Sequence, residues 1–217
     1  NYSIYMNKDY GNVKGYTFSL TKRYDPKTKT SAFVDYTYQI TEGNSVNSGS
    51  FYYNALSGEE EEKRIVPLSW DQRHIFNTNV SIGDPGNWNI GIISKLSSGW
   101  PYTPNIPNAN YVPQPNSGRK PLQWRVDMRI HKNFILGKYN YILYAKIYNL
   151  LDRRNERYVF NDTGRAGYTY VFQSTQETQG FKKHYGEPGI HQWSEYQVRP
   201  HYYTPPRSIN IGLSLDF

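Results

Sequence analysis

The strict alternation of apolar and polar residues over positions 208–217 constrains the fold more than any other feature. Alternation with a period of two is typical of a β-strand that has one apolar and one polar face. The apolar face would carry Ile209, Ile211, Leu213, Leu215 and Phe217. About ten residues are enough for a tilted strand to cross the apolar core of a bilayer. The pattern therefore predicts a strand in a wall between lipid and water.

The composition favours a membrane protein that crosses with strands. The chain has 217 residues, 37% of them hydrophobic, and its mean hydropathy is -0.81. A membrane-spanning helix is excluded because the chain has no run of about 20 apolar residues. A barrel wall is compatible with these values, since only alternate residues contact lipid. The 22 Tyr and 5 Trp support a wall as well, because amphipathic rings concentrate at membrane interfaces.

Six further segments repeat the alternation, at 13–24, 31–41, 74–83, 88–96, 123–131 and 139–148. Short connections follow the first, third and fifth of these segments, and two of them begin with an Asp-Pro pair that is typical of a tight turn. The other connections are long and polar or rich in Pro and Asn. Bacterial outer-membrane barrels show this asymmetry, with short turns in the periplasm and long loops outside.

These patterns predict an all-β protein, an antiparallel transmembrane β-barrel fragment of about seven strands with long extracellular loops and short periplasmic turns. The C-terminus would be periplasmic, which places the chain in the bacterial outer membrane. A bacterial single-chain barrel normally has an even number of strands. We therefore expect at least one more strand before Asn1, so that residues 1–217 are the C-terminal portion of a larger barrel domain.

The same residues give no support to catalysis or to a bound cofactor. The chain has no cysteine, which excludes disulfides and thiolate metal sites. The spacing of His184, His191 and His201 matches no metal-binding motif. Asp127 and His131 would lie on one strand face about 13 Å apart, beyond hydrogen-bonding distance. We expect no enzyme activity and no cofactor.

The net charge of +7 is not arranged in a stripe that would bind nucleic acid.

Several local sequences resemble those of the TonB-dependent outer-membrane receptors. Residues 149–155, Asn-Leu-Leu-Asp-Arg-Arg-Asn, are similar to the family's Asn-Leu-aromatic-Asp-basic element, with Leu151 where an aromatic residue is common. Residues 71–74, Asp-Gln-Arg-His, are similar to its Asp-x-Arg-His element. Residues 9–15 resemble a glycine-containing strand entry, and the final strand that ends in Phe resembles the signal read by the barrel assembly machinery.

The resemblance implies a barrel of about 22 strands around an N-terminal plug, with this chain as its last seven strands. The plug and the N-terminal strands would lie outside this sequence. It also implies an outer-membrane receptor that takes up a scarce ligand, such as a siderophore, a vitamin or a glycan, with energy delivered by the TonB complex. The implied partners are outer-membrane lipid, the receptor's own plug and upstream strands, the TonB complex through the N-terminal part, and the assembly machinery.

Three groups of residues are candidates for a role in such a receptor. Aromatic residues of the outer loops are expected to stack on a ligand or to anchor and pack the loops; they are Trp100, Tyr102, Tyr185, Trp193, Tyr196 and Tyr202. Polar residues are expected to face the lumen, where they contact the plug or stay hydrated; they are Arg125, Asp127, Arg129, Tyr144 and Lys146. The third group is the apolar set of 208–217, the expected insertion signal.

Two other functions fit parts of the pattern. A small outer-membrane barrel that acts as an enzyme or a passive pore would have the same wall. It would differ upstream, where a signal peptide would precede Asn1 directly and no plug would be encoded. A soluble all-β carbohydrate-binding domain would also contain alternating strands and aromatic loops, and it would stay monomeric without detergent.

Overall fold

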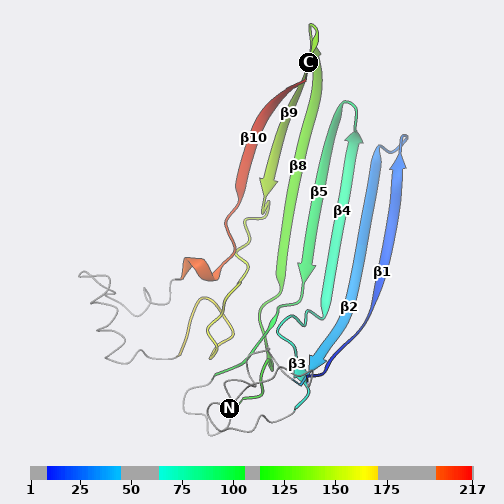
Figure 1. Cartoon of the computed structure of the whole chain (residues 1–217). Helices are drawn as coiled ribbons and strands as arrows, with labels where there is room; N and C mark the ends of the chain where they lie inside the picture. The colour runs from blue at the N-terminus through cyan, green and yellow to red at the C-terminus, as the bar shows by residue number, and fades with distance from the viewer. Residues whose placement is uncertain (1–8, 45–63, 106–112, 171–198, 217) are drawn as a thin grey trace, which may run out of the picture.

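The computed structural model describes residues 9–44, 64–105, 113–170 and 199–216. Within these residues the protein is all-β and has no α-helix. Seven long strands neighbour one another in the order β1-β2-β4-β5-β8-β9-β10 and form one antiparallel sheet (Figure 1). Their bounds are β1 Gly11–Asp25, β2 Thr30–Gly43, β4 His74–Asp84, β5 Trp88–Ser97, β8 Gln123–Leu136, β9 Tyr139–Tyr148 and β10 Ser208–Asp216. We call these seven strands the wall.

Short elements extend the connections between the strands of the wall. Strand β3, Val66–Pro67, pairs with β2, whereas β6, Pro101–Tyr102, and β7, Gly118–Arg119, form a separate two-stranded sheet. In the part of the chain that the structure describes, one 3-10 turn, η1, covers Pro200–Tyr202. The sequence did not predict these elements, because two or three residues are too few to show a period. None of the described residues belongs to a helix long and apolar enough to cross a membrane.

The seven predicted strands are confirmed, and so is the antiparallel all-β class. Their predicted bounds were too short in places, since β8 continues past 131 to Leu136 and β2 continues past 41 to Gly43. Among the described residues the sheet is open, because β1 pairs only with β2 and β10 pairs only with β9. Closure into a transmembrane barrel therefore stays a prediction.

Tight hairpins join the wall strands at one end, and aspartates stabilise two of them. The Asp25 carboxylate accepts hydrogen bonds from the Lys27 amide at 3.0 Å and from the Thr28 hydroxyl at 3.0 Å. The Asp84 carboxylate accepts one from the Gly86 amide at 3.1 Å. In each turn proline follows the aspartate and presets the backbone angle φ. Figure 1 shows these hairpins and the end of β10 together, at what we call the hairpin end, and the described parts of the long connections at the opposite loop end.

The pairing register places most apolar residues of the wall on one face, the apolar face, whereas Phe33 and Ile93 lie on the opposite, polar face. One row crosses five strands through directly paired residues, namely Ile82, Ile90, Ile130, Ala145 and Ile211. Much of this face is exposed: Phe18 is 64%, Ile211 74% and Leu213 60% accessible. Among the described residues the buried apolar side chains are Val66, Pro101, Val126, Val159 and Ala166. The wall is thus a single layer without a hydrophobic core of its own.

The register can be tested with a disulfide, because the chain contains no cysteine. Thr17 and Thr37 are directly paired, and their hydroxyl oxygens lie 3.0 Å apart. We expect the double variant Thr17→Cys/Thr37→Cys to oxidise readily, since paired Cβ atoms of neighbouring strands lie about 4.5–5.5 Å apart. Thr17→Cys/Asp35→Cys is the control, displaced by two residues. Equal cross-linking of the two pairs on a non-reducing gel would contradict the register.

Candidate functional site

The apolar face carries lysine and aromatic side chains near the hairpin end. Lys22 lies directly opposite Ala32, and its ammonium donates to the hydroxyls of Thr28 at 3.2 Å and Thr30 at 2.6 Å. The Phe134 and Tyr141 rings stack at 5.4 Å with an interplanar angle of 10°. Long cationic side chains and amphipathic rings with a polar tip are suited to the boundary between an apolar layer and water.

A second aromatic group lies on the same face nearer the loop end. The Tyr16 ring packs on Tyr38 at 5.5 Å and on Tyr36 at 6.4 Å. His74 shares this group, because its Nδ1 hydrogen-bonds the Tyr36 hydroxyl at 2.8 Å and its ring lies 5.2 Å from that of Tyr38. The apolar face is therefore an apolar band with rings toward both ends, which is the arrangement of aromatic girdles in membrane barrels.

A buried carboxylate ties the connections together at the loop end. Asp71 has no accessible surface. It accepts a hydrogen bond from the Thr41 amide at 2.9 Å, and the guanidinium groups of Arg73 and Arg119 donate to the same carboxylate. The side-chain amide of the neighbouring Gln72 donates to the Ser97 hydroxyl at 3.3 Å. Residues 71–74, noted above for their family resemblance, thus join β2, β5 and β7 at the base of the loops.

Residues 149–155 form a second such junction, between β9 and β10. Asn149 has a positive φ of 54°, and its side-chain amide donates to the Arg153 and Pro205 carbonyls at 3.1 Å each. The Asp152 carboxylate accepts from the Arg207 amide at 2.8 Å, just before β10 begins. Asn155 hydrogen-bonds both backbone groups of Trp124 in β8. These bonds give the Asn-Leu-Leu-Asp-Arg-Arg-Asn element a structural role.

The structure describes three of the six aromatic residues predicted to contact ligand. Trp100 follows β5 and is 38% accessible. Tyr102, in β6, packs so closely on Gly118 and Gly164 that a Cβ atom at either glycine would overlap its ring. Burial, with a smaller contribution from Asp162, raises the pKa of Tyr102. Tyr102 thus packs within the loops. The other three, Tyr185, Trp193 and Tyr196, lie outside the described residues.

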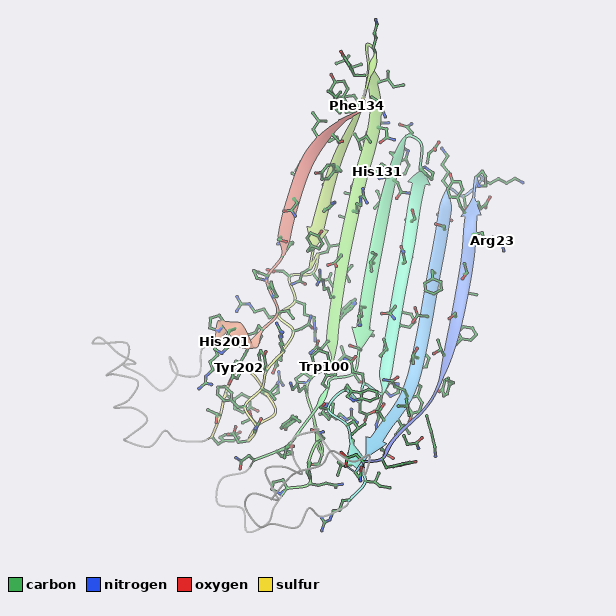
Figure 2. All side chains as sticks on the ribbon, in the orientation of Figure 1. Arg23, Trp100, His131, Phe134, His201 and Tyr202 are labelled. Carbon is green, nitrogen blue, oxygen red and sulfur yellow. The ribbon has the colours of Figure 1, made fainter. Side chains whose placement is uncertain are left out.

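Tyr202 belongs to a cluster of rings and cations that the sequence did not predict. Figure 2 shows His201 and Tyr202 on the loop side, beyond the strand ends. The Tyr202 ring lies 5.2 Å from Phe160, and the Arg199 guanidinium lies over both rings at 5.2 and 4.7 Å. Lys120 lies 5.9 Å from the centroid of the nearby Tyr158 ring, and burial lowers the pKa of this lysine. We call Lys120, Tyr158, Phe160, Arg199 and Tyr202 the loop cluster.

The predicted lumen residues all lie on the polar face, opposite the apolar face. Two of them contact each other, because the Arg125 Nε donates to the Asp127 carboxylate at 2.8 Å. The same carboxylate oxygen accepts from the Asn149 amide at 2.8 Å. The Lys146 ammonium lies 5.3 Å from the centroid of the Tyr144 ring. Asp127 therefore supports the wall. Within the described ranges, Arg129 makes no hydrogen bond or ion pair.

Groups of three or more His, Asp or Glu side chains that could hold a metal ion do not occur in the part of the chain that the structure describes. Its charged side chains instead form local ion pairs, such as that of Arg165 with Glu156 at 2.8 Å. Three arrangements remain as candidates for function: the apolar band, the loop cluster and the cationic residues of the polar face.

The junction at Asp71 yields a stability prediction. Asp71→Ala should lower the free energy of unfolding by about 3–5 kcal/mol, because it leaves the Arg119 and Arg73 charges without their buried partner. Asp152→Ala is the control; it removes one exposed hydrogen bond and should cost about 1 kcal/mol. Urea unfolding of the two variants in lipid vesicles measures the difference. Equal losses would show that the Asp71 junction is not a principal support of the loops.

Comparisons with known proteins do not assign the chain to a family. A scan against protein-family models found no match, and neither a search of curated proteins nor one of solved structures found a match. The resemblance of residues 71–74 and 149–155 to TonB-dependent receptors therefore stays a prediction.

Proposed function

We propose that this chain is part of the wall of a β-barrel in the bacterial outer membrane, in a receptor of the TonB-dependent kind that takes up a scarce ligand. The observation that carries the proposal is the single-layered sheet with one continuous, exposed apolar face and one polar face. Lipid outside and water inside are the two solvents that such a sheet requires.

The energetics of the apolar face favour lipid over water as its environment. Burying an exposed Leu, Ile or Phe side chain is worth about 1.5–3 kcal/mol. The face carries many such residues. Among them, Phe18, Leu20, Ile211 and Leu213 each have at least 60% of their surface accessible. Soluble proteins seldom expose contiguous apolar patches larger than a few hundred Å². A soluble carbohydrate-binding domain would need a second layer on this face, and the described residues supply none.

The two edges of the wall support a larger barrel. The outer edges of β1 and β10 carry backbone N–H and C=O groups without a strand partner among the described residues. Each such group would cost several kcal/mol in the apolar core of a bilayer. We therefore propose that further strands pair with both edges and close the barrel, with the hairpin end in the periplasm and the loop end outside.

The loop end supports a receptor over a simple pore. The junctions at Asp71 and Asn149 hold the bases of the long connections in fixed positions. The loop cluster adds rings and cations that are suited to contact a ligand through stacking and charge. Energised uptake, the plug and the TonB partner come from the family resemblance alone. A passive pore or a small barrel enzyme would share the wall, but no described residue favours either.

The facing of β10 can be tested with two adjacent substitutions. Leu213→Arg would place a charge in lipid and should cost about 2–4 kcal/mol near the bilayer midplane, whereas Ser214→Arg would face water and cost little. Folding into lipid vesicles, followed by the band shift of folded barrels on a gel, measures the difference. Equal folding of the two variants would contradict the assignment of the apolar face to lipid.

Transport can be tested in cells that lack the gene. Deletion should abolish accumulation of one nutrient supplied at a concentration too low for diffusion, and the intact gene should restore it. The same uptake should stop when the TonB complex is removed. Uptake that persists without TonB would identify a passive pore, and unchanged uptake of every nutrient tested in the deletion strain would contradict a transport function.

A further inference from the structure

One row of the polar face brings hydrogen-bond donors together from three strands. Arg129 of β8 lies directly opposite Lys146 of β9, and Lys146 lies directly opposite Asn210 of β10. Like charges in directly opposed positions of a sheet destabilise it unless an anion neutralises them. The row therefore has a charge imbalance within the wall itself.

Neighbouring residues do not correct this imbalance. No carboxylate in the described ranges forms an ion pair with Arg129 or Lys146. The acid nearest along β8, Asp127, already accepts from the Arg125 guanidinium and from the Asn149 amide. Within the described residues, the Lys146 ammonium makes its contact with the Tyr144 ring, at 5.3 Å from the centroid.

The surface around the row leaves space for a bound group. Gly91 of β5 is directly opposite Arg129, and a Cβ atom at Gly91 would meet no atom closer than 3.9 Å. The Tyr144 ring lies over Gly212, beside the row. Guanidinium, ammonium and amide groups are all donors, and the planar guanidinium pairs with a carboxylate or a phosphate through two parallel hydrogen bonds.

We propose that Arg129, Lys146 and Asn210 form a binding site for the carboxylate or phosphate group of a small anionic solute, so that the receptor's ligand is an anion. The inference rests on the proposed function, because a water-filled lumen is what gives a solute access to the polar face. Three positions on adjacent strands span about 10 Å. This span matches one compact anion better than an extended acidic segment of protein.

Protection of Lys146 from amine labelling tests the site in the complete protein, in isolated outer membranes. The probes are inorganic phosphate and citrate, with glucose as a neutral control and sodium chloride at matched ionic strength. At ten times the dissociation constant, a bound anion should slow acetylation of Lys146 about tenfold, since only the free fraction reacts. Lys138, in the β8–β9 hairpin, is the internal reference and should react at an unchanged rate.

Two variants separate the site from general electrostatics. Arg129→Gln should abolish the protection of Lys146, whereas Arg129→Lys should keep part of it. Lys95→Gln removes a positive charge elsewhere on the polar face and should leave the protection intact. Equal slowing of Lys146 and Lys138, the same slowing by chloride, or no slowing at all would overturn the proposal. The wild-type comparison stands even if a variant fails to fold.

A third arm distinguishes a solute from a protein segment. Without added anion, a carbodiimide joins lysine amines to carboxylates that contact them, and mass spectrometry identifies the joined peptides. A cross-link from Lys146 to an acidic segment would overturn the proposal in favour of a protein occupant. Membrane fractionation of the same samples tests the proposed function separately: absence from the outer membrane refutes the barrel wall, whereas missing protection in a correctly inserted protein refutes only the anion site.

Discussion

Every other feature of the structure depends on the register with which the seven long strands pair. Side chains alternate between the two faces of a strand, so a slip by one residue would move the whole apolar set of that strand to the polar face. The hairpins set this register locally, and Asp25 and Asp84 stabilise two of the turns through hydrogen bonds to the amides that follow. The register in turn fixes which residues lie on the apolar face, which lie on the polar face, and which cations lie opposite each other.

The junctions at the loop end connect the wall to the loops. Asp71 lies in the connection before β4 and is fully buried, and its partners come from β2, from β7 and from its own segment. Asn149 joins the end of β9 to the segment before β10 in the same way. Hydrogen bonds and ion pairs thus join the segments of the loop end, where the buried apolar side chains Val66, Val159 and Ala166 also lie. In the receptor that we propose, such a fixed base would hold the loops in position to contact a ligand.

The sequence was informative where structure is local. The strands followed from an alternation of period two, and the tight turns followed from Asp-Pro pairs, because both depend on neighbouring residues alone. Contacts between distant segments left no such pattern. Arg119 is 48 positions from its partner Asp71, and the loop cluster joins Lys120 and Tyr158 with Arg199, so neither could be predicted. The pairing of Lys146 with Asn210 required the register of β9 with β10, two strands joined by a long connection.

Spin labels placed one at a time along residues 124–132 of β8, in the protein reconstituted in a bilayer, test the central claim most directly. Collisions with oxygen report contact with lipid, and collisions with a water-soluble nickel complex report contact with water. The account predicts that both profiles alternate with a period of two and in opposite phase, with oxygen highest at Val126, Met128 and Ile130. Profiles without alternation, or with the nickel complex highest at those three positions, would contradict a wall that separates lipid from a lumen.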